Sequence, residues 1–194
     1  MTDLKDSARA RTASAKRQRL MRAAAEVMHR QGAERTTIAD IARAAEVPVG
    51  NVYYYFKTKD ELVVAALSEH THQLDLLTGE LDRLPDPRER LKGLIGAWVA
   101  QRDLAARYGC PTGTLAVELD KGQGGLDVEA GKVIRLLLTW AEAQFRELNL
   151  PQPDGLALTL VGAYQGMSLL ANALRDPGIM EREGARLLAW IDSL

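Results

Sequence analysis

The sequence predicts an all-α protein in which a small amino-terminal unit of three helices precedes a larger helical bundle. Apolar residues recur with the helical period along most of the 194 residues, whereas strand-like alternation is nearly absent. Formal charge is also divided: residues 1–60 hold 12 Lys or Arg against 7 Asp or Glu, and residues 61–194 hold 13 against 19. A basic unit joined to an acidic one is typical of a polyanion-binding module with a non-binding partner domain, although chance also produces such unevenness.

Composition narrows the class of protein. The chain is 46% apolar, which is enough for a sizeable core, and its net charge is −1. Cys110 is the only cysteine, which excludes an intrachain disulfide. No run of about 18 apolar residues is evident, and the cationic first twenty residues lack the apolar segment of a secretory signal. We therefore expect a cytoplasmic protein that does not enter the membrane and that needs no cofactor or metal.

The first predicted helix follows a polar segment. Residues 1–14 are rich in Ala, Ser, Thr and Arg, and we expect a flexible basic arm there. From Ala15 onward, one face of a helix is marked by apolar residues at Leu20, Ala24, Val27 and Met28. Gly32 follows the last periodic residue and is expected to cap the carboxyl end of this helix.

Two short helices are predicted next. Thr37 and Asp40 have the spacing of a capping box, which opens a helix with apolar positions at Ile38, Ile41, Ala42 and Ala45. Pro48 suits the first turn of a third helix, which we expect over residues 49–56. Two short helices joined by a tight turn and preceded by a longer helix predict a helix-turn-helix domain over residues 15–60.

Residues 61–194 are predicted to form the larger bundle. Thr58 and Glu61 have the spacing of a second capping box, at the start of a long helix that ends near Thr78. The further expected helices are 88–108, 115–120 capped by Thr114, 127–148, 155–174 capped by Asp154, and 181–193. Residues 79–87 and 109–113 are expected as connections, and residues 122–125 as a flexible glycine-rich loop.

Four of the ten aromatic residues stand together in the third helix, as Tyr53-Tyr54-Tyr55-Phe56. At the helical period, Val52 and Phe56 lie within about 40° of each other and face the core. Tyr54 then points to the far side, and Tyr53 and Tyr55 flank the boundary. A helix cannot bury three consecutive tyrosines on one side, so part of this run must face outward.

The outward face of the third helix has the chemistry of a DNA reader. Gly50 carries no side chain and lets the helix approach a groove closely. Asn51 can reach a base edge or a phosphate, and Val49 can pack on a thymine methyl group. We therefore interpret Val49, Gly50 and Asn51 as the residues nearest the bases.

Four more residues are predicted to contact the DNA backbone. The hydroxyls of Tyr53 and Tyr54 are good phosphate donors. Lys59 beside the start of the fourth helix, and Thr37 at the start of the second, combine with free backbone N–H groups as anion sites. The ordinary alternatives are core packing for the tyrosines and a solvated side chain for Lys59.

The segment GAERTTIADIARAAEVPVGNVYYYFKTKDEL resembles the amino-terminal signature of the TetR/AcrR family of transcriptional regulators. The resemblance spans about residues 15–65, and its matching residues are Gly32, Thr36, Thr37, Ile38, Ile41, Ala42, Ala45, Val47, Gly50, Val52, Tyr53, Phe56, Lys59, Glu61 and Leu62. Glu46 stands where the family usually has a turn glycine, and Pro48 where it often has a capping Ser or Thr. Residues 108–119 further resemble a segment found in one broad subgroup of the family.

This resemblance implies a homodimeric regulator whose partner is double-stranded DNA. Each subunit would place its third helix in a major groove of a palindromic operator. The carboxy-terminal domain would dimerise through its last two long helices, at about 154–174 and 181–193, and would hold a small-molecule effector. Effector binding would move the fourth helix and separate the two recognition helices. A repressor is the expected role, and an activator stays open.

The bundle offers candidates for the effector pocket. We expect a cavity between the helices that carry Trp98, Trp140 and Tyr164, and its candidate lining residues are Trp98, Tyr108, Cys110, Trp140, Tyr164, Gln165 and Met167. The simpler alternative is that these side chains are core, and that Cys110 is an inert buried thiol rather than a redox sensor. The segment 155–174 is apolar almost all round, which favours burial against both its own domain and a second subunit.

Two other function classes have weaker support. An enzyme would need catalytic groups, but the chain offers one cysteine and three scattered histidines, His29, His70 and His72, without triad or metal-ligand spacing. A protein-binding helix-turn-helix is the other alternative, and it has no general need for a basic head.

Overall fold

The computed structural model describes residues 2–120 and 125–194, with side chains from residue 13 onward, and every regular element in these ranges is a helix. In chain order they are α1 (Thr2–Gln31), α2 (Ile38–Ala44), α3 (Val49–Tyr55), α4 (Lys59–Leu81), α5 (Pro87–Ala100), α6 (Arg102–Tyr108), α7 (Pro111–Leu119), α8 (Leu126–Glu147), α9 (Pro153–Leu174) and α10 (Gly178–Ser193). The all-α prediction is confirmed. Most of the glycine-rich loop expected at 122–125 lies outside the described residues.

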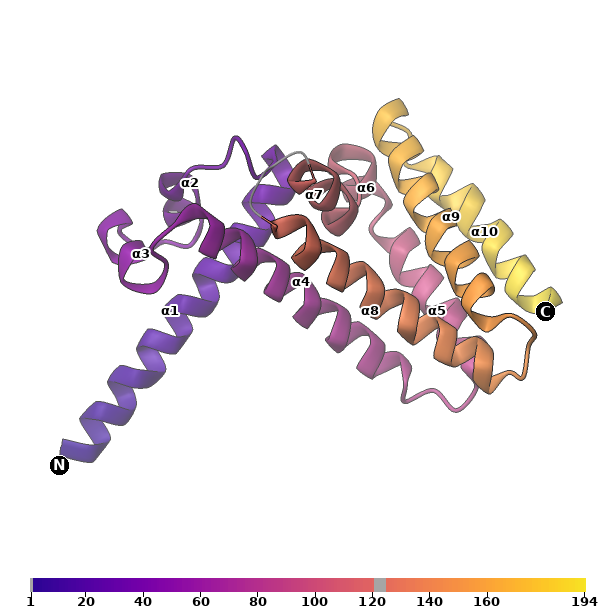
Figure 1. Cartoon of the computed structure of the whole chain (residues 1–194), viewed down its shortest axis with the longest axis horizontal. Helices are drawn as coiled ribbons and strands as arrows, with labels where there is room; N and C mark the ends of the chain where they lie inside the picture. Colours follow the sequence, from indigo (N-terminus) through magenta and orange to yellow (C-terminus); the bar gives the residue numbers. More distant parts are fainter. Residues whose placement is uncertain (1, 121–124) are drawn as a thin grey trace.

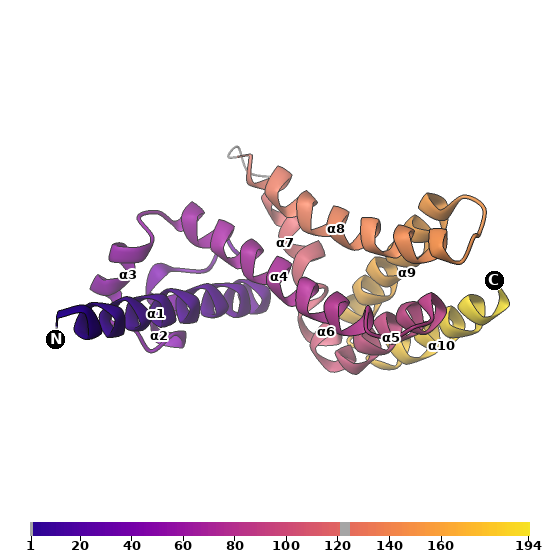
Figure 2. The ribbon, with the colours of Figure 1, turned by 90° about the horizontal axis from the view of Figure 1, so that it is seen from below.

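The molecule is elongated, with a head at one end and a body at the other (Figure 1). The head contains α1, α2, α3 and the first half of α4, and the body contains α5 to α10. The second half of α4 runs out of the head along α8 (Figure 1, Figure 2). One helix therefore belongs to both parts.

Helix α1 is longer than the sequence pattern predicted. It begins at Thr2, so residues 2–14, which were expected as a flexible arm, continue the helix. The physical reason is composition, because the alanines, arginines and lysine of this segment are strong helix formers. The predicted end is confirmed: Gly32 adopts φ +85°, and its N–H donates to the Met28 carbonyl at 2.8 Å.

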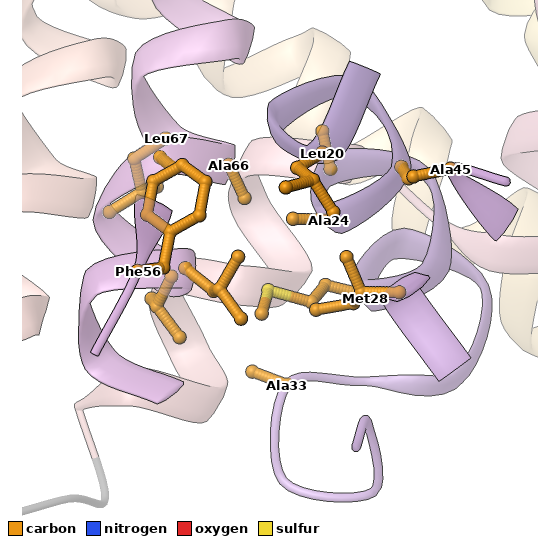
Figure 3. Packing of buried hydrophobic residues seen from close by; sticks show 14 of the residues in the cluster. Leu20, Ala24, Met28, Ala33, Ala45, Phe56, Ala66 and Leu67 are labelled. Carbon is orange, nitrogen blue, oxygen red and sulfur yellow. The ribbon is translucent and has the colours of Figure 1, made fainter. Parts of the chain in front are cut away.

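The head has its own hydrophobic core (Figure 3). Helix α1 contributes Leu20, Ala24 and Met28, and these pack with Phe56 and with side chains of α2 and α4. The core continues along α4 to Leu67 and also takes in Leu115, Ala130 and Val133 from the body. The predicted domain boundary at residue 60 therefore falls in the first turn of α4. The next two turns of this helix still belong to the core of the head.

The body departs from the predicted helices at residue 101. A single helix was expected over 88–108, but α5 ends at Ala100 and α6 begins at Arg102, with Gln101 at φ −95° and ψ 12° between them. No glycine or proline marks this break. Helix α5 packs against α10 and α6 against α9, so the change of direction serves tertiary packing.

Two predicted helix caps are also corrected. Helix α7 begins at Pro111, and Cys110 is its cap, with the Sγ accepting a hydrogen bond from the Gly113 N–H at 3.3 Å. Thr114 instead lies inside the helix and donates its hydroxyl to the Cys110 carbonyl. Asp154 does not cap α9, because Pro153 occupies the first helical turn after Gln152 at φ +53°. Proline at this position is itself a helix-start signal.

Helix α9 is long and apolar enough to span a membrane by length and composition alone, with a mean hydropathy of 1.2 over its most apolar window. Such a segment was not expected from the sequence. In the structure α9 packs against α6, α8 and α10 and buries Leu160, Val161, Met167 and Ala171. Its apolar composition is therefore used at least in part for packing within the body.

Candidate DNA-binding face and ligand cavity

The capping box at the start of α2 is formed as predicted. The Thr37 hydroxyl oxygen accepts from the Asp40 N–H, and the Thr37 N–H donates to the Asp40 carboxylate, each at 3.1 Å. The Thr37 hydroxyl also donates to the same carboxylate at 2.6 Å. Hydrogen bonds from Thr37 hold the pKa of Asp40 below its ordinary value. Thr37 is exposed, but its hydroxyl proton is already bound within the head.

The turn between α2 and α3 contains a left-handed residue that is not glycine. Glu46 has φ +53° and donates its N–H to the Arg43 carbonyl at 3.2 Å. The next N–H, of Val47, donates to the Ala42 carbonyl at 2.9 Å. This pair of hydrogen bonds closes α2 and directs the chain into α3. The position where the family usually has glycine is thus one whose backbone favours glycine.

Helix α3 divides into a buried and an exposed side. Val52 is fully buried and Phe56 is 3% exposed, which confirms the predicted core residues. Tyr54 is 76% exposed, and Tyr55 is half-buried with its ring edge against Tyr54 at a centroid distance of 5.1 Å. The tyrosine run therefore forms the edge of an open surface.

The remaining residues proposed on this face are also exposed. Val49 and Tyr53 are each nearly half exposed, and Gly50 and Asn51 are open to solvent. A Cβ atom added at Gly50 would meet no atom within 4 Å, so the space above this residue is free for a ligand. These residues give α3 a continuous outward surface beside the tyrosines.

The ammonium group of Lys59 is hydrogen-bonded within the protein rather than fully solvated. Its Nζ donates to the Glu34 carbonyl at 2.7 Å, which ties the start of α4 to the loop before α2. The ammonium group has three donors, so two are left for other partners. Thr58 caps α4 by accepting from the Glu61 N–H, but the Glu61 carboxylate accepts from Lys57 rather than Thr58, so the predicted second capping box is only half formed.

Two cations near this face were absent from the prediction. Arg43 is exposed on α2 and pairs with Asp40 at 3.2 Å, and Lys57 follows α3 with its ammonium group on the Tyr53 carbonyl. Both could have been proposed as phosphate contacts from the sequence, because Arg43 is a basic residue within the first short helix and Lys57 is one just after the second.

A cavity of about 430 Å³ lies in the body between α4, α5, α7, α8 and α9. Four of the seven predicted lining residues border it: Trp98, Cys110, Tyr164 and Gln165. The Trp98 and Tyr164 rings stack with their centroids 4.3 Å apart and their planes inclined by 14°. Burial raises the pKa of the Tyr164 phenol well above its ordinary value of 10, so the phenol is neutral at physiological pH.

The other three predicted residues lie away from this cavity. Tyr108 packs its ring against His29 of α1, with the centroids 5.7 Å apart. Trp140 donates its Nε1–H to Asp82 at 2.9 Å, at the end of α4. Met167 is 2% exposed within the hydrophobic core of the body.

Helix α4 supplies lining residues that the sequence analysis did not select. They are His70, Gln73, Leu74, Leu76, Leu77 and Glu80. A signal was present, because His70 lies in the helical-spaced stripe that also carries Leu67, Leu74, Leu77 and Leu81. Burial lowers the pKa of His70 from 6.5 to about 4, and His29 nearby acts in the same direction.

The junction of head and body holds a second cavity, of about 620 Å³, lined by the end of α1 and residues of α7 and α9. Beside it, His29 donates its Nε2–H to the Gly109 carbonyl at 2.9 Å, and burial lowers the pKa of this histidine. On α7, the Glu118 carboxylate accepts hydrogen bonds from the N–H groups of Ala33 and Glu34. The loop before the helix-turn-helix is thereby attached to α7, which borders both cavities.

Helix α9 leaves an apolar stripe without cover in the single chain. Leu158, Leu169 and Leu174 are each about two thirds exposed, and Leu170 is half exposed. Gly162 lies among them and is open to solvent. Several large exposed apolar side chains along one helix are typical of a protein interface.

Comparisons with known proteins agree with this geometry. Residues 20–66 match the family described as "Bacterial regulatory proteins, tetR family". An uncharacterized HTH-type transcriptional regulator of Lactococcus lactis subsp. lactis is 28% identical over 179 residues, which covers 85% of this chain and 87% of that protein. The HTH-type transcriptional repressor KstR2 of Mycolicibacterium smegmatis is 34% identical over 88 residues, which covers 43% of this chain and only 42% of that repressor.

The whole fold is shared as well. A TetR transcriptional regulator from Chloroflexus aurantiacus superimposes with a TM-score of 0.81 at 22% identity, over 94% of this chain and 96% of that one. Its likeness covers head and body, whereas the family match is confined to the head. The chain is a DNA-binding transcriptional regulator, with a domain of the tetR family of bacterial regulatory proteins over residues 20–66 and the overall fold of a TetR transcriptional regulator.

Proposed function

We propose that the protein is a homodimeric repressor that leaves a palindromic operator when a small-molecule effector fills the cavity beside α4. The observation that carries this proposal is the double role of α4. Its first turns, including Leu62, Ala66 and Leu67, are core of the DNA-binding head, and its later turns, from His70 to Glu80, line the cavity. A ligand that displaces the later turns therefore acts on the same rigid helix that supports α3.

DNA binding is assigned to the exposed side of α3 and its neighbours. Tyr53, Tyr54 and Lys59 supply phosphate contacts, which set the affinity and make it depend on salt. In this proposal Val49 and Asn51 read base edges, and each contact contributes about 1–3 kcal/mol of discrimination. Gly50 leaves room for the groove wall, and Thr37 contributes through the backbone at the start of α2.

Dimerisation is assigned to the stripe on α9, with α10 beside it. The exposed leucines supply apolar area, and Gly162 permits close approach of a second helix. A two-fold interface brings the same patch of both subunits together, so two copies of α3 are related by the same axis. The operator that matches such a pair is palindromic. The relative from Mycolicibacterium smegmatis, named a repressor, supports repression as the role.

Effector release requires a difference in affinity between two dimer conformations. Nearly complete conversion needs a preference on the order of 10⁴-fold for the non-binding conformation. Effector and operator must then oppose each other reciprocally. The Glu118 and His29 hydrogen bonds offer a second connection from the body to the head, in addition to α4.

A mobility-shift experiment tests the DNA-binding part of this proposal. The full-length protein is mixed with the intergenic DNA upstream of its own gene, at salt concentrations from 50 to 200 mM. We expect a discrete complex that unrelated DNA of equal length does not compete away, and whose affinity falls steeply with salt. Equal binding to both DNAs contradicts sequence-specific recognition.

The two alternative functions predict different outcomes. An enzyme would turn over a compound without DNA, and among the described residues no three His, Cys, Asp or Glu side chains gather as a metal site. A protein-binding module would show no salt-dependent complex with the upstream DNA.

A further inference from the structure

We propose that the cavity beside α4 binds an uncharged aromatic molecule that carries a hydroxyl group, and that this hydroxyl forms a hydrogen bond with Nε2 of His70. The inference rests on the proposed function, because it names the class of effector that the cavity takes. Its support is the combination of an apolar aromatic cavity, the absence of an available lining charge and one unpaired buried nitrogen.

The shape and the lining favour an aromatic body. A volume of about 430 Å³ is within the range of small-molecule sites, roughly 300–1,000 Å³. One wall carries the stacked rings of Trp98 and Tyr164, and leucines of α4 and aliphatic residues of α8 form other walls. A ring placed against the aromatic pair gains contact area together with favourable ring-ring geometry.

The charges of the lining disfavour an ionic ligand. No lysine or arginine is among the described residues that border the cavity, so a carboxylate or phosphate has no cation to pair with. Glu80 is the one lining carboxylate in that set, and it is exposed and already paired with Arg83 at 2.9 Å. Because a buried ion without a partner is costly, these residues select a neutral molecule.

His70 supplies the polar anchor. His70 borders the cavity, but in the ligand-free protein its Nε2 has almost no accessible surface and no hydrogen-bond partner, so a bound hydroxyl reaches this atom when the imidazole ring turns toward the cavity. Leaving a buried polar atom unpaired is costly, and a ligand that forms a hydrogen bond with it recovers that cost. Gln165, another polar lining residue, already donates to the Cys110 Sγ at 3.5 Å. A hydroxyl can donate or accept, so it pairs with His70 in either tautomer of the neutral ring.

Calorimetric titration with matched probes tests this inference on the purified, DNA-free protein at pH 7.5. The probes are 2-naphthol, naphthalene, 2-naphthoate and 2-naphthylmethylammonium, which share one ring system and differ in the polar group. We expect 2-naphthol to bind about tenfold tighter than naphthalene, as one buried hydrogen bond provides. Both ionic probes should bind more weakly than 2-naphthol.

Two histidine variants provide the controls. His70→Phe keeps a ring of similar size, and it should bind naphthalene at least as well as the wild type while losing the preference for 2-naphthol. Thermal unfolding of this variant, at an unchanged or higher midpoint, shows that it folds. His72→Phe alters an exposed histidine two residues away that does not line the cavity, and it should keep the tenfold preference.

Each contrary result overturns the inference: no binding of 2-naphthol, tighter binding of an ionic probe, or a hydroxyl preference that persists in His70→Phe. Failure of the proposed function looks different. If 2-naphthol binds through His70 but does not weaken the complex with operator DNA, the ligand class stands and effector release is wrong. If DNA is released only by a charged compound that binds elsewhere, release stands and the ligand class is wrong.

Discussion

Val52 and Tyr54 are separated by only one residue of α3, but one is core and the other is exposed. Val52 is fully buried in the core of the head, whereas Tyr54 is 76% exposed and its ring lies 5.1 Å from the ring of Tyr55. An exposed tyrosine with a free hydroxyl contributes little to folding but can donate to a phosphate. The two residues can therefore be tested separately.

The first prediction concerns the hydroxyl of Tyr54. Tyr54→Phe removes a donor without changing the ring, and we expect operator affinity to fall about tenfold, as for loss of one hydrogen bond to a charged group. Fluorescence anisotropy with labelled operator measures the change. The salt dependence should stay the same, since tyrosine is uncharged.

Lys59→Met removes a positive charge and is compared with Tyr54→Phe, which removes none. It should weaken binding and also reduce the slope of log affinity against log salt by about one unit. Unchanged affinity in both variants at moderate salt means that the face assigned to DNA is wrong. A fall in unfolding midpoint for Tyr54→Phe contradicts the purely external role of its side chain.

A second prediction at this scale concerns the turn before α3. Glu46 occupies the left-handed region at φ +53°, which costs a residue with a side chain roughly 1–2 kcal/mol. Glu46→Gly removes this strain but adds freedom to the unfolded chain, so the free energy of unfolding should rise by about 0.5–1 kcal/mol. Urea denaturation at fixed protein concentration measures it. Ala44→Gly, at an exposed position in α2, should have the opposite sign, a loss of about 1 kcal/mol.

At the scale of elements, the helix starts and ends that could be predicted from the sequence were those that contacts between neighbouring residues determine. The capping box of Thr37 and the glycine stop at Gly32 depend on contacts within a few residues, and both appear as expected. The break at Gln101 could not be predicted in this way, because it arises from the packing of α5 and α6 against different helices. At Cys110, a sulfur atom replaced the usual oxygen cap, and propensity arguments favoured Thr114 instead.

The third prediction concerns the stripe on α9. Leu158→Glu places a carboxylate in the proposed interface, where two-fold symmetry presents it twice. The buried charge has no partner, and we expect the dimer dissociation constant to rise at least about 10³-fold. Sedimentation equilibrium measures the change, and the variant should bind operator only weakly because it lacks the paired recognition helices.

Val128→Glu is the matched control for this change. Val128 lies on α8 and is 61% exposed, close to the 64% of Leu158, so the two substitutions alter surface charge equally. We expect this control to remain a dimer with wild-type affinity for DNA. If Leu158→Glu also remains a dimer, another surface joins the subunits.

At the scale of the whole molecule, the candidate site joins parts that sequence spacing cannot relate. The exposed side of α3 was predictable, because helical period and a few residue types define it. The cavity was predictable only in part: Trp98 and Tyr164 meet as expected, but Trp140 turns to Asp82, and Tyr108 to His29. Which aromatic residues line a cavity depends on the rotation of packed helices, and this is set by long-range contacts.

The last prediction links the cavity to stability of the whole chain. Burial lowers the pKa of His70 from 6.5 to about 4, so between these values the folded protein binds fewer protons than the unfolded chain. The free energy of unfolding is therefore highest above pH 6.5 and falls as the pH drops toward 4. His29, whose pKa burial also lowers, adds in the same direction.

Asp40 and Asp176 do not contribute within that window, because their pKa values lie below the ordinary 3.8 and their effect appears only in more acidic solution. In urea unfolding, the contribution of His70 should lower the free energy of unfolding by about 2 kcal/mol between pH 7.5 and pH 5. His70→Phe should remove most of that loss while being at least as stable at pH 7.5, since an unpaired buried nitrogen is gone. An equal loss in wild type and variant means that protonation of His70 is not opposed by folding, and that its ring is open to water beside the cavity.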